Sequence, residues 1–88
     1  MKIIEYNGKA IKLPFAVGLS EDPTAEEEIR NRFGGESCTL PGFAVAVYDV
    51  ILGSEVIAEH DADAVRTMRK GLDWFRKYFP KQYMTLLD

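Results

Sequence analysis

The chain has 88 residues, of which 47% are hydrophobic and 28% are charged. This length allows one hydrophobic core, so we expect a single domain over residues 1–88. A single cysteine, Cys38, excludes an intramolecular disulfide and a cysteine-based metal site. The N-terminus has lysines and a turn, and the apolar runs are short, so we expect no signal peptide, no membrane contact and a cytoplasmic protein.

The charge is distributed unevenly along the chain. Residues 1–19 carry a net charge of +2, residues 20–63 carry −9 and residues 64–88 carry +4, which gives −3 for the whole chain. Such asymmetry indicates charged surfaces that meet a partner or one another.

The first segment, KIIEYNGKAIKLP, predicts a β-hairpin. Asn7-Gly8 is the dipeptide that a type I′ turn prefers, because both central residues of that turn need positive φ. Short runs of strand-forming residues flank the turn, and Pro14 limits the second strand because it has no N–H to donate.

The next segment, SEDPTAEEEIRNRFGG, predicts a short helix. Asp22 is a suitable N-cap, Pro23 suits the first helical position, and Gly34 can end the helix. Glutamates stand four residues before Arg30 and Arg32, in the order that stabilises a helix. The apolar stripe is narrow, so we expect this helix to lie on the surface.

The segment TLPGFAVAVYDVILGSEVIAE carries conflicting signals. Its valines and isoleucines favour a strand, whereas its alanines, Asp49 and a helix-start pattern at Thr39 and Pro41 favour a helix. Nearly every position from 43 to 52 is apolar, which is typical of a segment buried on almost all sides. We predict a central helix over 43–58 with a break or bend near Gly53, and the strand alternative for 43–52 stays open.

The last long element is predicted to be an amphipathic helix that starts at Asp61 or Asp63 and ends at Pro80. At 100° per residue, its apolar side chains form one stripe. The stripe contains Val65, Met68, Leu72, Phe75 and Phe79, with Gly71, Trp74 and Tyr78 on its flank. The opposite side, which we name the basic arc, consists of Arg66, Arg69, Lys70, Arg76 and Lys77.

Three conformations stay open for the tail, KQYMTLLD: an edge strand against the hairpin, a final helical turn, or a segment that docks on another molecule. Gln82 ahead of Met84, Leu86 and Leu87 loosely resembles peptides that dock on DNA sliding clamps, although no terminal aromatic residue follows. Packing of these side chains on the domain's own core is the interpretation that we favour.

No catalytic residue, metal site or cofactor is predicted. His60 is the one histidine of the chain, and the acids beside it, Glu59, Asp61 and Asp63, are typical of a helix start. A metal or acid–base site needs groups from several elements, and a nucleophile needs a base beside it. No glycine-rich phosphate loop follows a strand. We therefore expect that the protein is not an enzyme.

The candidate binding residues are those of the basic arc and the two aromatic residues that border it, Trp74 and Tyr78. Aromatic side chains supply rigid contact area, while basic side chains steer encounter with an acidic partner. Alternatively, the arc follows the phosphates of a nucleic acid and the aromatics stack on bases, although the isoelectric point near 5.1 argues against this. A further alternative is that the acidic middle of the chain mimics the charge of a nucleic acid.

The stretches FGGESCTLPGFAVAVYDVILG and MRKGLDWFRKYFPKQYMTLLD resemble small uncharacterised proteins of tailed phages that infect marine cyanobacteria. The resemblance implies a host-cytoplasm setting and a protein that binds host or phage machinery. It implies no activity and no functional residue.

Together these features predict an α+β domain, with an N-terminal β-hairpin packed on two or three α-helices and a helix-rich C-terminal half. The predicted function is a non-enzymatic accessory or regulatory protein that binds another protein. Its predicted contacts are the basic arc, Trp74 and Tyr78, and the tail residues Gln82, Met84, Leu86 and Leu87. The identity of the partner and self-association, which would help so small a domain, stay open.

Overall fold

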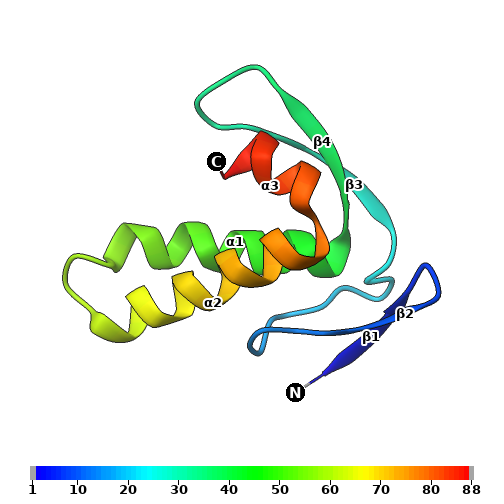
Figure 1. Ribbon diagram of the computed structural model, residues 1–88, viewed down its shortest axis with the longest axis horizontal. Coiled ribbons are helices and arrows are strands. Elements are labelled where there is room, and N and C mark those ends of the chain that lie inside the picture. Colours follow the sequence, from blue (N-terminus) through cyan, green and yellow to red (C-terminus); the bar gives the residue numbers. More distant parts are fainter. Residues whose placement is uncertain (1, 88) are drawn as a thin grey trace.

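The structure, a computed structural model, describes residues 2–87. Within them the chain forms two separate two-stranded antiparallel sheets, followed by three helices in the C-terminal half (Figure 1). The elements are β1 (Ile3–Tyr6), β2 (Lys9–Lys12), β3 (Glu26–Arg30), β4 (Ser37–Pro41), α1 (Gly42–Ile57), α2 (Ala62–Tyr78) and α3 (Pro80–Leu86). The predicted α+β fold class is confirmed.

The predicted N-terminal hairpin is also confirmed. Asn7 and Gly8 both adopt positive φ, 51° and 78°, as a type I′ turn requires, and the strands pair from Tyr6↔Lys9 outward. Ile4 and Ile11, which face one another across the strands, are buried in the core. The hairpin therefore contributes one apolar face to the domain.

The helix predicted around residues 22–33 is wrong. In its place, β3 pairs in antiparallel fashion with β4, with Ile29 opposite Cys38 and Glu27 opposite Leu40. The predicted N-cap, Asp22, stabilises a single turn instead of a helix. Its carboxylate accepts hydrogen bonds from the backbone N–H and the hydroxyl of Thr24.

Pairing with β4 gives the backbone of this segment hydrogen-bond partners, although Ile29 is the one side chain of β3 that is partly buried. As a strand, the segment joins β4, whose Leu40 is fully buried in the core, and it directs Ile29 towards the same core. Phe33 lies beyond the strand and is 85% exposed, and Arg32 pairs with Glu55 of α1 at 2.8 Å. Helix propensity is a weak preference that such non-local packing overrides.

The central helix is confirmed as α1. Pro41 precedes it in an extended conformation, and the buried side includes Phe43, Val47 and Ile51. The predicted break near Gly53 is not found, because the helix continues through Gly53 to Ile57. The strand alternative for 43–52 is thereby excluded.

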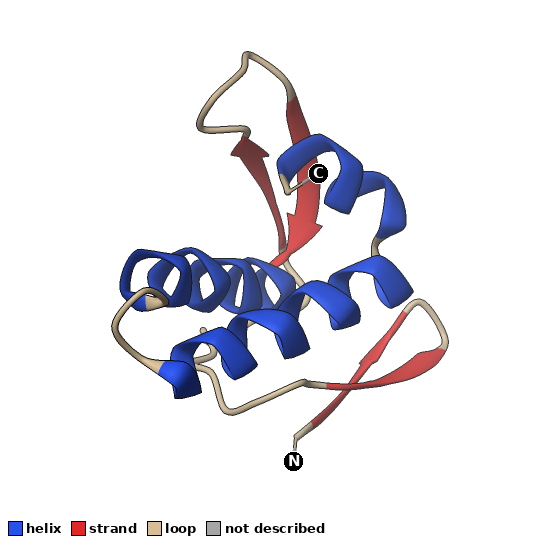
Figure 2. Cartoon of the chain, turned by 60° about the vertical axis from the view of Figure 1, so that its left-hand side comes forward, coloured by secondary structure: helices blue, strands red, loops and turns tan. Residues whose placement is uncertain are grey.

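The long amphipathic helix is confirmed as α2, which begins after Asp61 and ends at Tyr78. The Asp61 carboxylate caps it by accepting hydrogen bonds from the backbone N–H groups of Asp63 and Ala64. Helices α1 and α2 run antiparallel, side by side, in both overall views (Figures 1 and 2). Their packing buries Gly71 and Phe75, whereas Val65 of the predicted stripe is only partly buried.

The tail forms the short helix α3, so the helical alternative for this segment is the one observed. Leu86 is buried in the core, and Gln82 donates a hydrogen bond to the Thr39 carbonyl of β4 at 3.3 Å. Figures 1 and 2 both show α3 beside the β3–β4 hairpin and the β1–β2 hairpin beside the end of α2.

An aromatic cluster joins these parts at the centre of the domain. The fully buried ring of Phe43 lies 5.4 Å from the ring of Tyr6, 6.2 Å from that of Trp74 and 6.1 Å from that of Phe79, measured between centroids. Edge-on and tilted pairs at these distances are favourable aromatic geometries. The hairpin and the end of α2 are therefore held against the same core.

Candidate functional site

The five residues of the basic arc are all exposed along one side of α2, away from the core. Two of them pair with acids of the same helix, Arg66 with Asp63 and Arg76 with Asp73. Within residues 2–87, no acidic side chain forms an ion pair with Arg69, Lys70 or Lys77. All three side chains are exposed to solvent.

The two aromatic residues that border the arc differ in accessibility. Trp74 is only 6% exposed, and its indole N–H donates to the Lys12 carbonyl at 2.8 Å. Its place is therefore in the core against the hairpin, where it cannot serve as a surface contact. Tyr78 is half-buried, and the ammonium group of Lys77 lies 5.1 Å from the centre of its ring.

The predicted tail residues are also divided between core and surface. Leu86 is buried, whereas Met84 is 68% exposed, and Gln82 and Leu87 are intermediate. Gln82 lies beside Tyr78 in the hollow described below, but Met84 and Leu87 do not line it. The structure therefore does not gather all the predicted contacts into one site.

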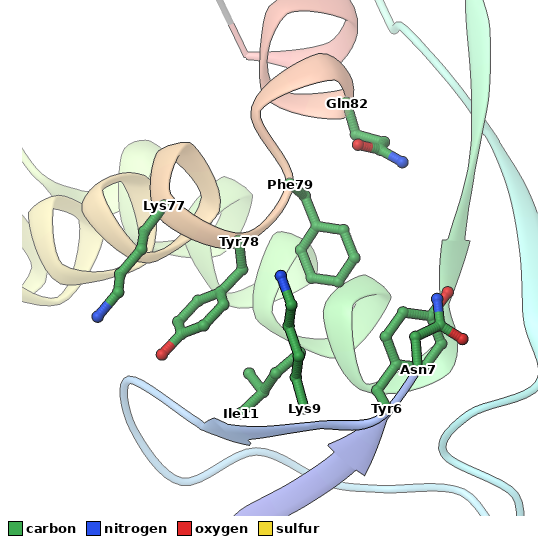
Figure 3. A pocket seen from close by; sticks show the side chains of 8 residues that line it. All are labelled: Tyr6, Asn7, Lys9, Ile11, Lys77, Tyr78, Phe79 and Gln82. Carbon is green, nitrogen blue, oxygen red and sulfur yellow. The ribbon is translucent and has the colours of Figure 1, made fainter.

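A hollow of about 300 Å³ separates the β1–β2 hairpin from the corner between α2 and α3 (Figure 3). Its hairpin side is lined by Tyr6, Asn7, Lys9 and Ile11, and its helical side by Lys77, Tyr78, Phe79 and Gln82. Figure 3 shows the Lys9 side chain rising from the hairpin into this hollow, and the Tyr78 ring between Lys9 and Lys77.

A second hollow, of about 360 Å³, adjoins the first. It is lined by Lys12, Leu13, Pro14, Asp73, Trp74, Lys77 and Tyr78. Lys77 and Tyr78 line both hollows, and we name the two hollows together the hairpin groove. Its lining combines lysine side chains with aromatic rings.

One titratable group in the groove wall is clearly perturbed. Burial raises the pKa of Tyr6, and its hydrogen bond to the Glu26 carboxylate, at 3.2 Å, raises that pKa further together with the charge of Glu26. Tyr6 therefore stays a neutral phenol at physiological pH, and its hydroxyl links the groove wall to β3.

The hairpin groove brings together the two basic parts of the sequence. Lys9 and Lys12 come from the positively charged N-terminal part, and Lys77 from the positively charged C-terminal part. Lys77, Tyr78 and Gln82 were predicted as contacts from the sequence, whereas the residues on the hairpin side of the groove were not. The positive charge of residues 1–19 was the available signal, but only the packing of the hairpin on α2 shows where that charge lies.

The surroundings of His60 offer no converging set of groups. His60 is exposed in the turn between α1 and α2, and Asp61 beside it is the cap of α2. Across residues 2–87, no three histidine, cysteine, aspartate or glutamate side chains lie close enough together to hold a metal ion. Cys38 is half-buried, and this burial raises the pKa of its thiol.

Comparison with known proteins finds no family model, no curated protein and no solved structure that matches this chain. In the part of the chain that the structure describes, no helix combines the length and the apolar character needed to cross a membrane.

Proposed function

We propose that this protein is a non-enzymatic accessory or regulatory protein of the cytoplasm, which binds an acidic surface of another protein. The observation that supports the proposal most is the continuity of positive charge from the hairpin to α2. Lys9 and Lys12 adjoin Lys77 across the hairpin groove, and Lys77 continues into the basic arc. Exposed charges of one sign steer association with a partner of the opposite sign.

The groove supplies the apolar contact that charge alone does not provide. Tyr78 is half-buried and lines both hollows of the groove, and the buried side chains of Phe79 and Ile11 line the first hollow with it. Tyrosine is one of the residues enriched at the energetically important positions of protein interfaces. Tyr78 is therefore the aromatic contact we propose, in place of the buried Trp74.

The nucleic-acid alternative has less support. Stacking on bases needs exposed aromatic rings, and the burial of Trp74 leaves Tyr78 as the one aromatic residue that borders both the groove and the arc. The charge-mimic alternative also has less support, because the acidic residues do not form one surface. Glu26, Glu27 and Glu28 lie on β3 near the start of α1, whereas Glu59, Asp61 and Asp63 lie beyond its other end.

Affinity capture with mass spectrometry tests the proposal. The tagged protein is expected to recover a protein with an acidic surface in stoichiometric amount from a cytoplasmic extract of its natural source. Reversing two charges of the arc, Lys70→Glu with Lys77→Glu, is expected to reduce recovery about fivefold or more, since each reversal replaces an attraction by a repulsion. Recovery that the double reversal leaves unchanged would remove the basic arc from the proposal.

A matched control separates this effect from that of net charge. The pair Lys2→Glu and Lys81→Glu changes the charge of the protein equally, at exposed positions outside the arc and the groove. Recovery should stay close to that of the unmodified protein. A gel-shift titration with single-stranded oligonucleotides at low salt tests the alternative, and retardation that weakens steeply with salt would favour nucleic acid.

A further inference from the structure

The floor of the hairpin groove is apolar and already formed. Ile11 is 3% exposed, and Trp74 and Phe79 are each 6% exposed. The hydrogen bond to the Lys12 carbonyl fixes the Trp74 ring, whose centroid lies 5.6 Å from that of Phe79. These buried side chains hold the partly exposed ring of Tyr78 in place, so the apolar surface that a ligand meets is that ring, and its fixed position costs little ordering on binding.

The rim of the groove is positively charged on both sides of Tyr78. Figure 3 shows Lys9 on one side of the Tyr78 ring and Lys77 on the other. Asp73 is the one acidic residue that lines the groove, and its carboxylate already pairs with Arg76. The charge pattern matches a ligand that has two negative groups with an apolar group between them.

Neutral amide groups complete the first hollow. The side chains of Asn7 and Gln82 line it from the hairpin and from α3, on the side away from Lys77 (Figure 3). Primary amides both donate and accept hydrogen bonds, and they therefore suit the N–H and C=O groups of a peptide main chain.

We infer that the hairpin groove binds an extended acidic peptide segment of the partner, with carboxylate side chains on both sides of an aromatic or leucine side chain. The inference rests on the proposed function and names the part of the partner that is recognised. In an extended chain alternate side chains point the same way, so residues i, i+2 and i+4 reach the groove together. The central apolar side chain packs on Tyr78, and the two carboxylates approach Lys9 and Lys77.

A synthetic peptide tests this inference directly. The probe is acetyl-Glu-Ser-Phe-Ser-Glu-amide, titrated into the ¹⁵N-labelled protein and followed by two-dimensional NMR. The backbone amides of Lys9, Lys77 and Tyr78 and the indole N–H of Trp74 are expected to shift with one common dissociation constant. A peptide with glutamine in place of both glutamates, and one with alanine in place of phenylalanine, should each bind more weakly.

Charge-reversal variants test whether the peptide probe binds in the hairpin groove. Lys9→Glu and Lys77→Glu should each weaken binding of the probe by about threefold to thirtyfold, the range expected when an exposed ion pair becomes a repulsion. Lys2→Glu is the matched control, because Lys2 belongs to the same end of the chain and is exposed but does not line the groove. An equal loss with Lys2→Glu would show general attraction of charge and overturn the inference.

The two proposals fail in different ways. If the probe shifts only amides on the outer side of α2, or shifts none, the groove is not the peptide site, whereas capture of an acidic protein through the basic arc can still succeed. If the probe binds in the groove and capture is unaffected by Arg69→Glu with Lys70→Glu, two residues of the basic arc that do not line the groove, the basic arc is not the contact surface. Groove shifts produced by a single-stranded oligonucleotide and not by the probe would also overturn the inference.

Discussion

Asn31 connects two parts of the protein through a single side chain. Its amide nitrogen donates to the Thr85 carbonyl of α3 at 2.6 Å. Its amide oxygen accepts hydrogen bonds from the backbone N–H of Phe33, at 2.7 Å, and of Gly34, at 3.1 Å. The loop between β3 and β4 is therefore tied to the C-terminal helix although 54 residues separate Asn31 from Thr85.

We predict that Asn31→Ala lowers the free energy of unfolding by about 1–3 kcal/mol, because it leaves several backbone groups without their partner. Urea unfolding followed by the fluorescence of Trp74, the one tryptophan, measures this change. Gln82→Ala is the control, since it removes a single bond of 3.3 Å near the surface and should cost less than about 1 kcal/mol. Equal losses for the two variants would contradict the role of Asn31.

Helices α1 and α2 approach closely where Gly71 faces Ile51. A methyl group built on Gly71 would lie 2.5 Å from Cγ1 and 2.9 Å from Cδ1 of Ile51, which is less than any normal contact. Gly53, in the interior of α1, is exposed and has nothing within 4 Å of the same position. Packing therefore explains why position 71 is a glycine, whereas no contact in the fold requires a glycine at position 53.

This difference predicts opposite effects for the same substitution. Gly71→Ala should destabilise the protein by about 1–3 kcal/mol, because the crowding of Ile51 outweighs the better helix propensity of alanine. Gly53→Ala should stabilise it by about 0.5–1 kcal/mol, because propensity acts there alone. Thermal and urea unfolding of the two variants measure both effects, and stabilisation by Gly71→Ala would show that the helices are not packed as described.

The elements also show which local signals are decisive. The periodicity of residues 61–79 predicted α2 because one apolar side and one charged side recur over several turns. Residues 22–33 also carry helix start and stop signals, but their apolar side is too narrow to hold a helix on the core. Strand pairing with residues 37–41 supplied backbone partners and placed Ile29 against the core, and the sequence of β3 alone does not contain this information.

At the scale of the whole molecule, three buried or half-buried acids of high pKa link folding to pH. Burial raises the pKa of Cys38, Tyr6 and Tyr48 above their ordinary values of 9.0 for the thiol and 10.0 for the phenols. For Tyr48, nearby Arg32 lowers the pKa, and the charges of Asp49 and Glu55 raise it, but burial is the largest cause. In each case the folded protein holds the proton more strongly than the unfolded chain does.

We therefore predict that the free energy of unfolding falls as the pH rises above about 9. Stability from a group with a raised pKa is complete below its unfolded pKa and is lost as the pH passes through its folded pKa. Urea unfolding at intervals from pH 7 to pH 11 measures the decline. Tyr6→Phe should make the decline less steep, because it removes one of the three groups, and stability that rises over this range would contradict the prediction.

The positions of the charged side chains in space also depend on how the whole molecule folds. In the sequence, the basic N-terminal and C-terminal parts stand on either side of an acidic middle. In the fold, Lys9 and Lys12 lie across a groove from Lys77, while the acids of residues 26–28 lie on β3. A protein of negative net charge therefore carries a locally positive surface at the groove.

The sequence leaves residues 43–52 open between helix and strand, although it favours a helix. It specifies more fully two features that depend on neighbouring residues, the Asn7-Gly8 turn and the amphipathic helix that begins at Asp61 or Asp63. It also placed the five arginines and lysines of the basic arc on one exposed side. Each of these follows from local backbone preference or from a periodic pattern, which a linear sequence displays.

The packed fold was needed to establish the conformation of residues 26–30, the burial of Trp74 and the existence of the hairpin groove. Each depends on contacts between distant positions, such as Ile29 with Cys38 or Trp74 with Lys12, 62 residues away. The free energy of burying apolar surface depends on which elements meet, and no local pattern specifies the partner. The basic arc could therefore be predicted from the sequence, but the groove beside it could not.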